Sequence, residues 1–85
     1  MIIWDDDKNQ KLQNERDISF EEISEIMLRK EYFDILENPS RSNQQIFVVK
    51  INNYIYSVPF IIDEQSNIIL KTAFPSRKLH KKYMR

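Results

Sequence analysis

Residues 46–62 read IFVVKINNYIYSVPFII and contain the strongest strand pattern in the chain. Two mainly apolar runs flank Asn52-Asn53, and Asn tolerates the positive φ that a two-residue hairpin turn requires. The expected facing pairs are Ile51 with Tyr54, Val49 with Tyr56 and Phe47 with Val58 on one side, and Lys50 with Ile55 and Val48 with Ser57 on the other. Because the first side is entirely apolar or aromatic, we expect it to cover a core. We interpret Trp4, Tyr54, Tyr56 and Phe60 as core residues rather than a stacking platform.

The segment ISFEEI, residues 18–23, predicts the start of a helix. Ser19 is its expected N-cap, and Glu22 stands three residues later, which is the spacing of a capping box. The isoleucines at the two ends of this segment have the spacing of a hydrophobic staple. Apolar residues then recur at helical spacing, so we expect a helix over roughly 19–30 that buries one face.

The remaining elements complete an α+β layout for a single domain spanning residues 1–85. We expect a short strand over 2–4, a polar surface helix over about 6–15 that Asp5 caps, and a third strand over 68–74 that Pro75 ends. A short basic helix over 76–85 follows, capped by Ser76, with Leu79 and Tyr83 facing inward. The expected sheet has three antiparallel strands, with the helices on one face.

The composition excludes several classes of chemistry. The chain has no Cys, so it has no disulfide framework and no thiolate site, and without Gly it has no glycine-rich phosphate loop. With His80 as its one imidazole, a zinc site is not expected, and Asp5-Asp6-Asp7 fits a helix start better than a metal cluster. We predict no metal and no cofactor. No signal-peptide pattern or membrane span is present, so a cytoplasmic protein is expected.

The neutral net charge conceals a division between the two halves of the chain. Residues 1–37 hold 11 acids and 5 bases, whereas residues 38–85 hold 2 acids and 8 bases. This asymmetry suggests a basic surface for an anionic partner. Alternatively, the acidic half neutralises the basic half within one fold.

The basic charge is concentrated in TAFPSRKLHKKYMR, residues 72–85, which has five Lys or Arg, one His and no acid. In a helix, Arg77, Lys81 and Arg85 form one row and Lys78 and Lys82 an adjacent row, with Lys71 on the preceding strand and His80 and Tyr83 interleaved. Bases beside aromatic groups suit a nucleic-acid backbone. The alternative is a solvated, charged terminus. His80 is either a general acid–base group or an ordinary surface residue.

Several segments together resemble the BrnT family of type II toxin–antitoxin toxins. They are Trp4-Asp5-x-x-Lys8-Asn9, Ile18-Ser19-Phe20-Glu21-Glu22, Glu37-Asn38-Pro39-Ser40-Arg41 and, after the hairpin, Lys71-Thr72-Ala73-Phe74-Pro75-Ser76-Arg77-Lys78. The resemblance covers nearly the whole chain in order. It departs from the family pattern where Pro75-Ser76 replaces the usual Ser-Ala, where a family His is missing from residues 38–42, and where Lys81 and Lys82 stand in place of a Glu.

The resemblance implies a RelE-like fold and a metal-independent endoribonuclease that inhibits translation. A cognate antitoxin would neutralise it, and the complex would repress its operon, touching DNA only through the antitoxin. Arg77 matches the Arg of the family's Ser-Ala-Arg element, and we expect it to act on the phosphate. His80 and Tyr83 are our candidates for the acid or base. Arg41, Lys71, Lys78, Lys81 and Lys82 would bind RNA phosphates. Two alternatives are a non-catalytic nucleic-acid- or partner-binding module and a structural protein whose basic end serves an acidic protein.

Overall fold

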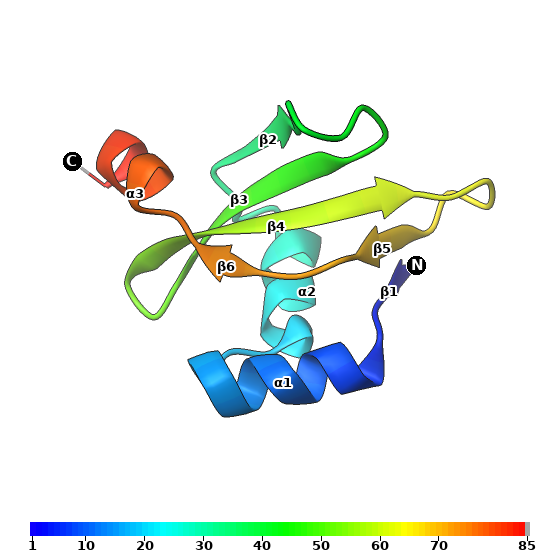
Figure 1. Ribbon diagram of the computed structural model, residues 1–85, viewed down its shortest axis with the longest axis horizontal. Helices are drawn as coiled ribbons and strands as arrows, with labels where there is room; N and C mark the ends of the chain where they lie inside the picture. The colour runs from blue at the N-terminus through cyan, green and yellow to red at the C-terminus, as the bar shows by residue number, and fades with distance from the viewer. Residues whose placement is uncertain (85) are drawn as a thin grey trace.

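The predicted hairpin lies at the centre of the sheet in the computed structural model, which describes residues 1–84 (Figure 1). β3 (Gln45–Ile51) and β4 (Tyr54–Ile62) pair antiparallel in the expected register. Asn52 and Asn53 adopt φ angles of 50° and 64°. The predicted turn and facing pairs are therefore confirmed, and the apolar side of the hairpin contributes to the main core.

Within residues 1–84 the sheet has six strands, so the prediction of a three-stranded antiparallel sheet is wrong, although the α+β class is confirmed. The strand order is β1–β5–β4–β3–β2, and β6 also pairs with β4. The further strands are β1 (Ile2–Ile3), β2 (Asp34–Glu37), β5 (Ile68–Leu70) and β6 (Phe74–Pro75). β1 runs parallel to β5, which makes the sheet mixed. The sequence did not reveal β2 because this edge strand is mostly exposed and lacks an alternating apolar pattern.

The strand predicted over 68–74 is divided into β5 and β6 by a bulge. Leu70 pairs with Phe60 and Phe74 pairs with Ser57, so three residues, 71–73, lie opposite two residues of β4. One of those two is Pro59, which accepts a hydrogen bond from the Lys71 amide at 2.9 Å but has no N–H to donate in return. The missing donor explains why the ladder is interrupted here.

α1 (Asp6–Arg16) and α2 (Phe20–Leu28) begin at the predicted caps. The Asp5 carboxylate accepts hydrogen bonds from two backbone amides, and Ser19 and Glu22 form the capping box. α2 ends before the predicted residue 30 because Arg29 is its C-cap and Lys30 takes a positive φ of 57°. In the part of the chain that the structure describes, no helix is both long and apolar enough to cross a membrane.

The buried side chain of Asn9 joins α1 to α2. Its Oδ1 accepts a hydrogen bond from the Phe20 amide at 2.8 Å, and its Nδ2 donates to Glu21 Oε1 at 2.7 Å.

We predict that Asn9→Ala lowers the free energy of unfolding by about 1–3 kcal/mol, because the Phe20 N–H then stays buried without an acceptor. Denaturant unfolding measures this loss. As the control, Asn14→Ala on the same helix changes an exposed Asn and should shift stability by less than about 0.5 kcal/mol. Equal stability of the Asn9→Ala protein and the wild type would contradict the role of Asn9.

The main core lies between the two N-terminal helices and one face of the sheet. Trp4 packs against it with its ring centroid 5.9 Å from that of Phe20, and the predicted core placement of Tyr54, Tyr56 and Phe60 is confirmed. Its buried members are Leu12, Ile18, Phe20, Ile23, Met27, Phe47, Val49, Ile51, Tyr56, Val58, Phe60, Leu70 and Ala73.

α3 (Arg77–Tyr83) packs on the other face of the sheet, so the prediction that all helices share one face is wrong. The Tyr83 hydroxyl contacts Asp34, which pairs with Val48 on the side away from the main core. Val48 and Ile55 are fully buried on that side, which shows that its apolar residues also need a cover. Figure 1 shows α3 well away from α1 and α2. The Ser76 cap is confirmed, whereas Arg85, predicted as part of this helix, lies outside the described residues.

Candidate nucleic-acid interface

An open groove of about 1000 Å³ lies partly over the sheet face opposite the main core and extends to α1 and to the core residues Leu12 and Ala73. Leu36, Ile46 and Pro59 face one another across β2, β3 and β4 and form much of its floor, and Ser57 continues that floor along β4. Its walls are the loop before β3, the bulged segment after β5, one side of α1 and the beginning of α3. The groove therefore joins segments that are far apart in the sequence.

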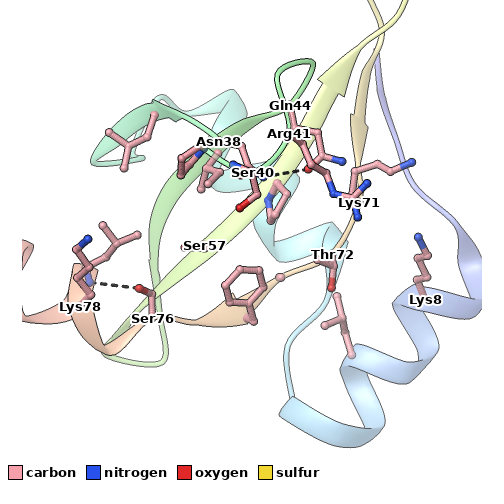
Figure 2. Close-up of a pocket in the computed structure, with 18 of the residues that line it drawn as sticks. Lys8, Asn38, Ser40, Arg41, Gln44, Ser57, Lys71, Thr72, Ser76 and Lys78 are labelled. Atoms are coloured by element: carbon pink, nitrogen blue, oxygen red, sulfur yellow. Dashed lines mark hydrogen bonds between the residues drawn. The ribbon is translucent and has the colours of Figure 1, made fainter.

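The lining of the groove is strongly basic. Two carboxylates, Glu15 and Glu37, stand against six cationic side chains. The cations are Lys8, Lys11, Arg16, Arg41, Lys71 and Lys78. Figure 2 shows Arg41 and Lys71 toward one end and Lys78 toward the other, with Ser57 between them. A polyanion laid along the groove would meet positive charge at both ends.

Five of the six groove cations have no ion-pair partner within residues 1–84. In residues 1–84 the one ion pair joins Lys11 Nζ to Glu15 Oε2 at 3.8 Å, and both partners are exposed. The other groove cations have no carboxylate within 4 Å among the residues described. Among residues 1–84 no ion pair within 4 Å joins the acidic half of the chain to the basic half, although the charge of Lys82 still acts on Asp34. Unpaired cations sharing a groove repel one another, and an anionic ligand relieves that repulsion.

Local backbone structure fixes two of the predicted phosphate-binding residues at the groove. Arg41 lies in a turn in which its amide donates to the Asn38 carbonyl and its carbonyl accepts from the Gln44 amide. Lys71 is the first residue of the bulge, where the chain leaves the regular ladder. Bulges often redirect a side chain in this way.

The structure brings Arg41, Lys71 and Lys78 together at the groove but leaves the other predicted site residues outside its lining. Arg77, Lys81 and Lys82 are exposed on α3, which extends the positive surface beyond the groove. Lys82 Nζ lies 5.3 Å from the ring centroid of Tyr83.

His80 and Tyr83 take part in contacts that hold α3 on the sheet. The His80 ring stacks on Tyr54 with centroids 4.0 Å apart, and its Nδ1 accepts a hydrogen bond from the Ile55 amide at 3.3 Å. Nδ1 must be unprotonated to accept this bond. The Tyr83 hydroxyl donates to Asp34 Oδ2 at 2.8 Å, and its ring packs edge-on against Phe33.

The Tyr83–Asp34 bond predicts a pH window for this docking. The bond from Tyr83 lowers the pKa of Asp34 below its ordinary 3.8, and the same bond raises the pKa of Tyr83 above its ordinary 10.0. The Asp34 contribution to stability is therefore present above pH 3.8 and is lost as pH falls through the lowered pKa. The Tyr83 contribution is present below pH 10.0 and is lost as pH rises through the raised pKa.

We expect Tyr83→Phe to be less stable than the wild type between these limits and to match it at both extremes. Urea unfolding at several pH values measures the difference. An NMR titration of the Asp34 carboxyl adds a direct readout, because its pKa should return toward 3.8 in the variant. A stability difference that persists unchanged at low and high pH would contradict this role for the bond.

The sequence-based prediction of site residues did not include three cations that line the groove, Lys8, Lys11 and Arg16. They lie on one side of α1 at helical spacing, and the sequence already held that signal. The sequence did not indicate these three residues as site residues, because they lie in the acidic half of the chain, where acids outnumber bases. Asp5, by contrast, is a helix cap as predicted. No group of three or more potential metal ligands gathers among the described residues.

Comparison with protein-family models, with curated proteins and with solved structures finds no match for this chain.

Proposed function

We propose that this chain is the toxin of a type II toxin–antitoxin system, a metal-independent endoribonuclease that binds RNA along the basic groove. The observation that carries the RNA-binding part is the groove itself, where six cations meet two carboxylates and a single ion pair is formed in residues 1–84. The toxin assignment rests on the resemblance of the sequence segments to the BrnT family. The α+β fold with a central antiparallel hairpin is compatible with the RelE-like architecture that this resemblance implies.

The proposed reaction is an attack of a ribose 2′-oxygen on the adjacent phosphorus. The 2′-hydroxyl gives its proton to a base, the P–O5′ bond breaks, and an acid protonates the leaving 5′-oxygen. Arg77 would stabilise the added negative charge on the phosphate, because its planar guanidinium can donate two parallel hydrogen bonds to phosphate oxygens. Arg77 is exposed and precedes the groove residue Lys78 directly. Lys81 and Lys82 would add phosphate contacts along α3.

His80 and Tyr83 remain the proposed acid–base candidates, and each must leave its present contact to act. His80 Nδ1 is occupied by the Ile55 amide, and Tyr83 is committed to Asp34. These two hydrogen bonds favour a second candidate function, a non-catalytic module that binds RNA or a partner in an operon-repressing complex. The acidic partner in either case would be an antitoxin segment that covers the groove.

Growth of bacteria that carry the gene under a tight inducible promoter separates these functions. We predict that the wild type arrests growth and that Arg77→Ala restores it, with both proteins folded by circular dichroism. Lys50→Ala, which removes an exposed cation outside the groove, is the matched control and should remain toxic. A folded Arg77→Ala protein with full toxicity would rule out the assigned role of Arg77.

The state of cellular RNA identifies the activity behind any arrest. New RNA ends that appear on induction and disappear with Arg77→Ala would support the nuclease. RNA binding without new ends and without arrest would favour the non-catalytic module.

A further inference from the structure

An exposed aromatic ring lies inside the basic groove. Phe74 lines the groove and keeps 40% of its surface accessible, although most of the aromatic residues of this chain are more deeply placed. The main core does not include it. The exposed part of the Phe74 ring is therefore available to a ligand that enters the groove.

Strand pairing sets the position of the Phe74 backbone. It belongs to β6, where it pairs with Ser57, and the next residue is Pro75, which pairs with Tyr56. Residues that pair directly across a sheet share one face. Since Ser57 belongs to the groove floor, the pairing directs Phe74 to the same side.

The same segment places cations on both sides of the ring. Lys71 precedes Phe74 by three residues and Lys78 follows it by four, and both line the groove. Figure 2 shows Lys71 and Lys78 on opposite sides of Ser57, the pairing partner of Phe74. A ring between two cationic positions matches a chain in which phosphates alternate with flat, apolar bases.

We propose that the groove takes single-stranded RNA with one unpaired base stacked on Phe74 and its flanking phosphates held by Lys71 and Lys78. This inference rests on the proposed function and specifies its substrate class. In a duplex the base faces are covered by their neighbours, so an exposed ring gains nothing from them. In a single strand the base can leave its stack and lie on the ring, and stacking of this kind tolerates any base.

The test compares three polyanions that carry different groups. They are a fluorescein-labelled short oligoadenylate, the same strand annealed to its complement, and inorganic polyphosphate, which has charge but no bases. We expect Phe74→Ala to bind oligoadenylate about 5- to 100-fold more weakly than the wild type, as alanine substitution of stacking residues generally does. Its affinity for polyphosphate and for the duplex should be unchanged. Phe74→Tyr keeps a ring and should bind like the wild type.

A second readout detects stacking directly. Phe74→Trp places an indole in the groove, and its fluorescence should be quenched by oligoadenylate but not by polyphosphate. The wild type, in which the partly buried Trp4 packs against the core, corrects for background fluorescence. Because Phe74 is partly exposed, the variants should fold, and circular dichroism checks this.

The possible outcomes separate the stacking inference from the proposed function on which it rests. Unchanged oligoadenylate affinity of Phe74→Ala, or an equal loss for all three polyanions, would overturn the stacking inference and leave the RNA-binding groove in place. A wild type that binds none of the three would overturn the proposed function itself. Polyglutamate that binds as tightly as oligoadenylate, with no effect of Phe74→Ala, would overturn the inference in favour of an acidic protein as the groove's ligand.

Discussion

Phe20→Ala will remove a large part of the free energy of unfolding of this protein. Phe20 is fully buried, it packs near Trp4, and its backbone amide is held by Asn9. Truncating a buried Phe removes about 3–5 kcal/mol, through lost burial and the cavity that remains. Small domains have only about 5–15 kcal/mol in total. For a chain of this size the expected drop in Tm is roughly 15 °C or more.

The matched control is Leu28→Ala at the end of the same helix. Leu28 keeps 74% of its surface exposed, so the free energy of unfolding should change by less than about 0.5 kcal/mol. Thermal unfolding followed by circular dichroism compares both variants with the wild type. Similar Tm values for Phe20→Ala and Leu28→Ala would mean that the core is not built around Phe20.

The double variant Arg41→Glu/Lys71→Glu will lose most of its affinity for RNA. Both side chains line the groove, and neither is in an ion pair among the described residues. The change removes two phosphate contacts and adds two charges that repel phosphate. We expect binding to weaken by roughly 100-fold or more at low salt, and the slope of log K against log [salt] to fall by about 1.4 for a single strand.

The control for this variant makes the same change in net charge elsewhere. Arg29→Glu/Lys30→Glu alters two exposed cations after α2 that do not line the groove. It should keep nearly the wild-type affinity and salt slope. If both double variants lose affinity equally, RNA is attracted by net charge alone and the groove is not a binding site.

The local patterns of the sequence were enough to predict the central elements. The Asn52-Asn53 turn, the register around it and the caps at Asp5, Ser19 and Ser76 depend on neighbouring residues, and all are present. The pairing of β1 with β5 joins the two ends of the chain, and no local pattern encodes it. The position of α3 depends on Val48 and Ile55, whose need for a cover becomes evident only once the sheet has two faces to fill.

Part of the candidate site was also predictable from local sequence, and the rest depends on how distant strands pair. The basic sequence of residues 72–85 was enough to predict Lys78 as a candidate phosphate-binding residue, and Lys78 lines the groove. The floor of the groove was not predicted, since it arises from the pairing of β2, β3 and β4. The bulge that begins at Lys71 and precedes Phe74 depends on Pro59, a residue on another strand. The sequence predicted Phe74 only as part of a strand, because its place in the groove depends on its pairing with Ser57.

The most direct test of the account is an NMR titration of the uniformly ¹⁵N-labelled protein with a short single-stranded RNA at low salt. We expect amide shifts to concentrate around Arg41, along residues 71–78 and on the Lys8 side of α1, and we expect added salt to reverse them. The amides near Leu28 should stay unchanged. No shifts at low salt, or shifts gathered away from the groove, would contradict the central claim that this basic groove binds RNA.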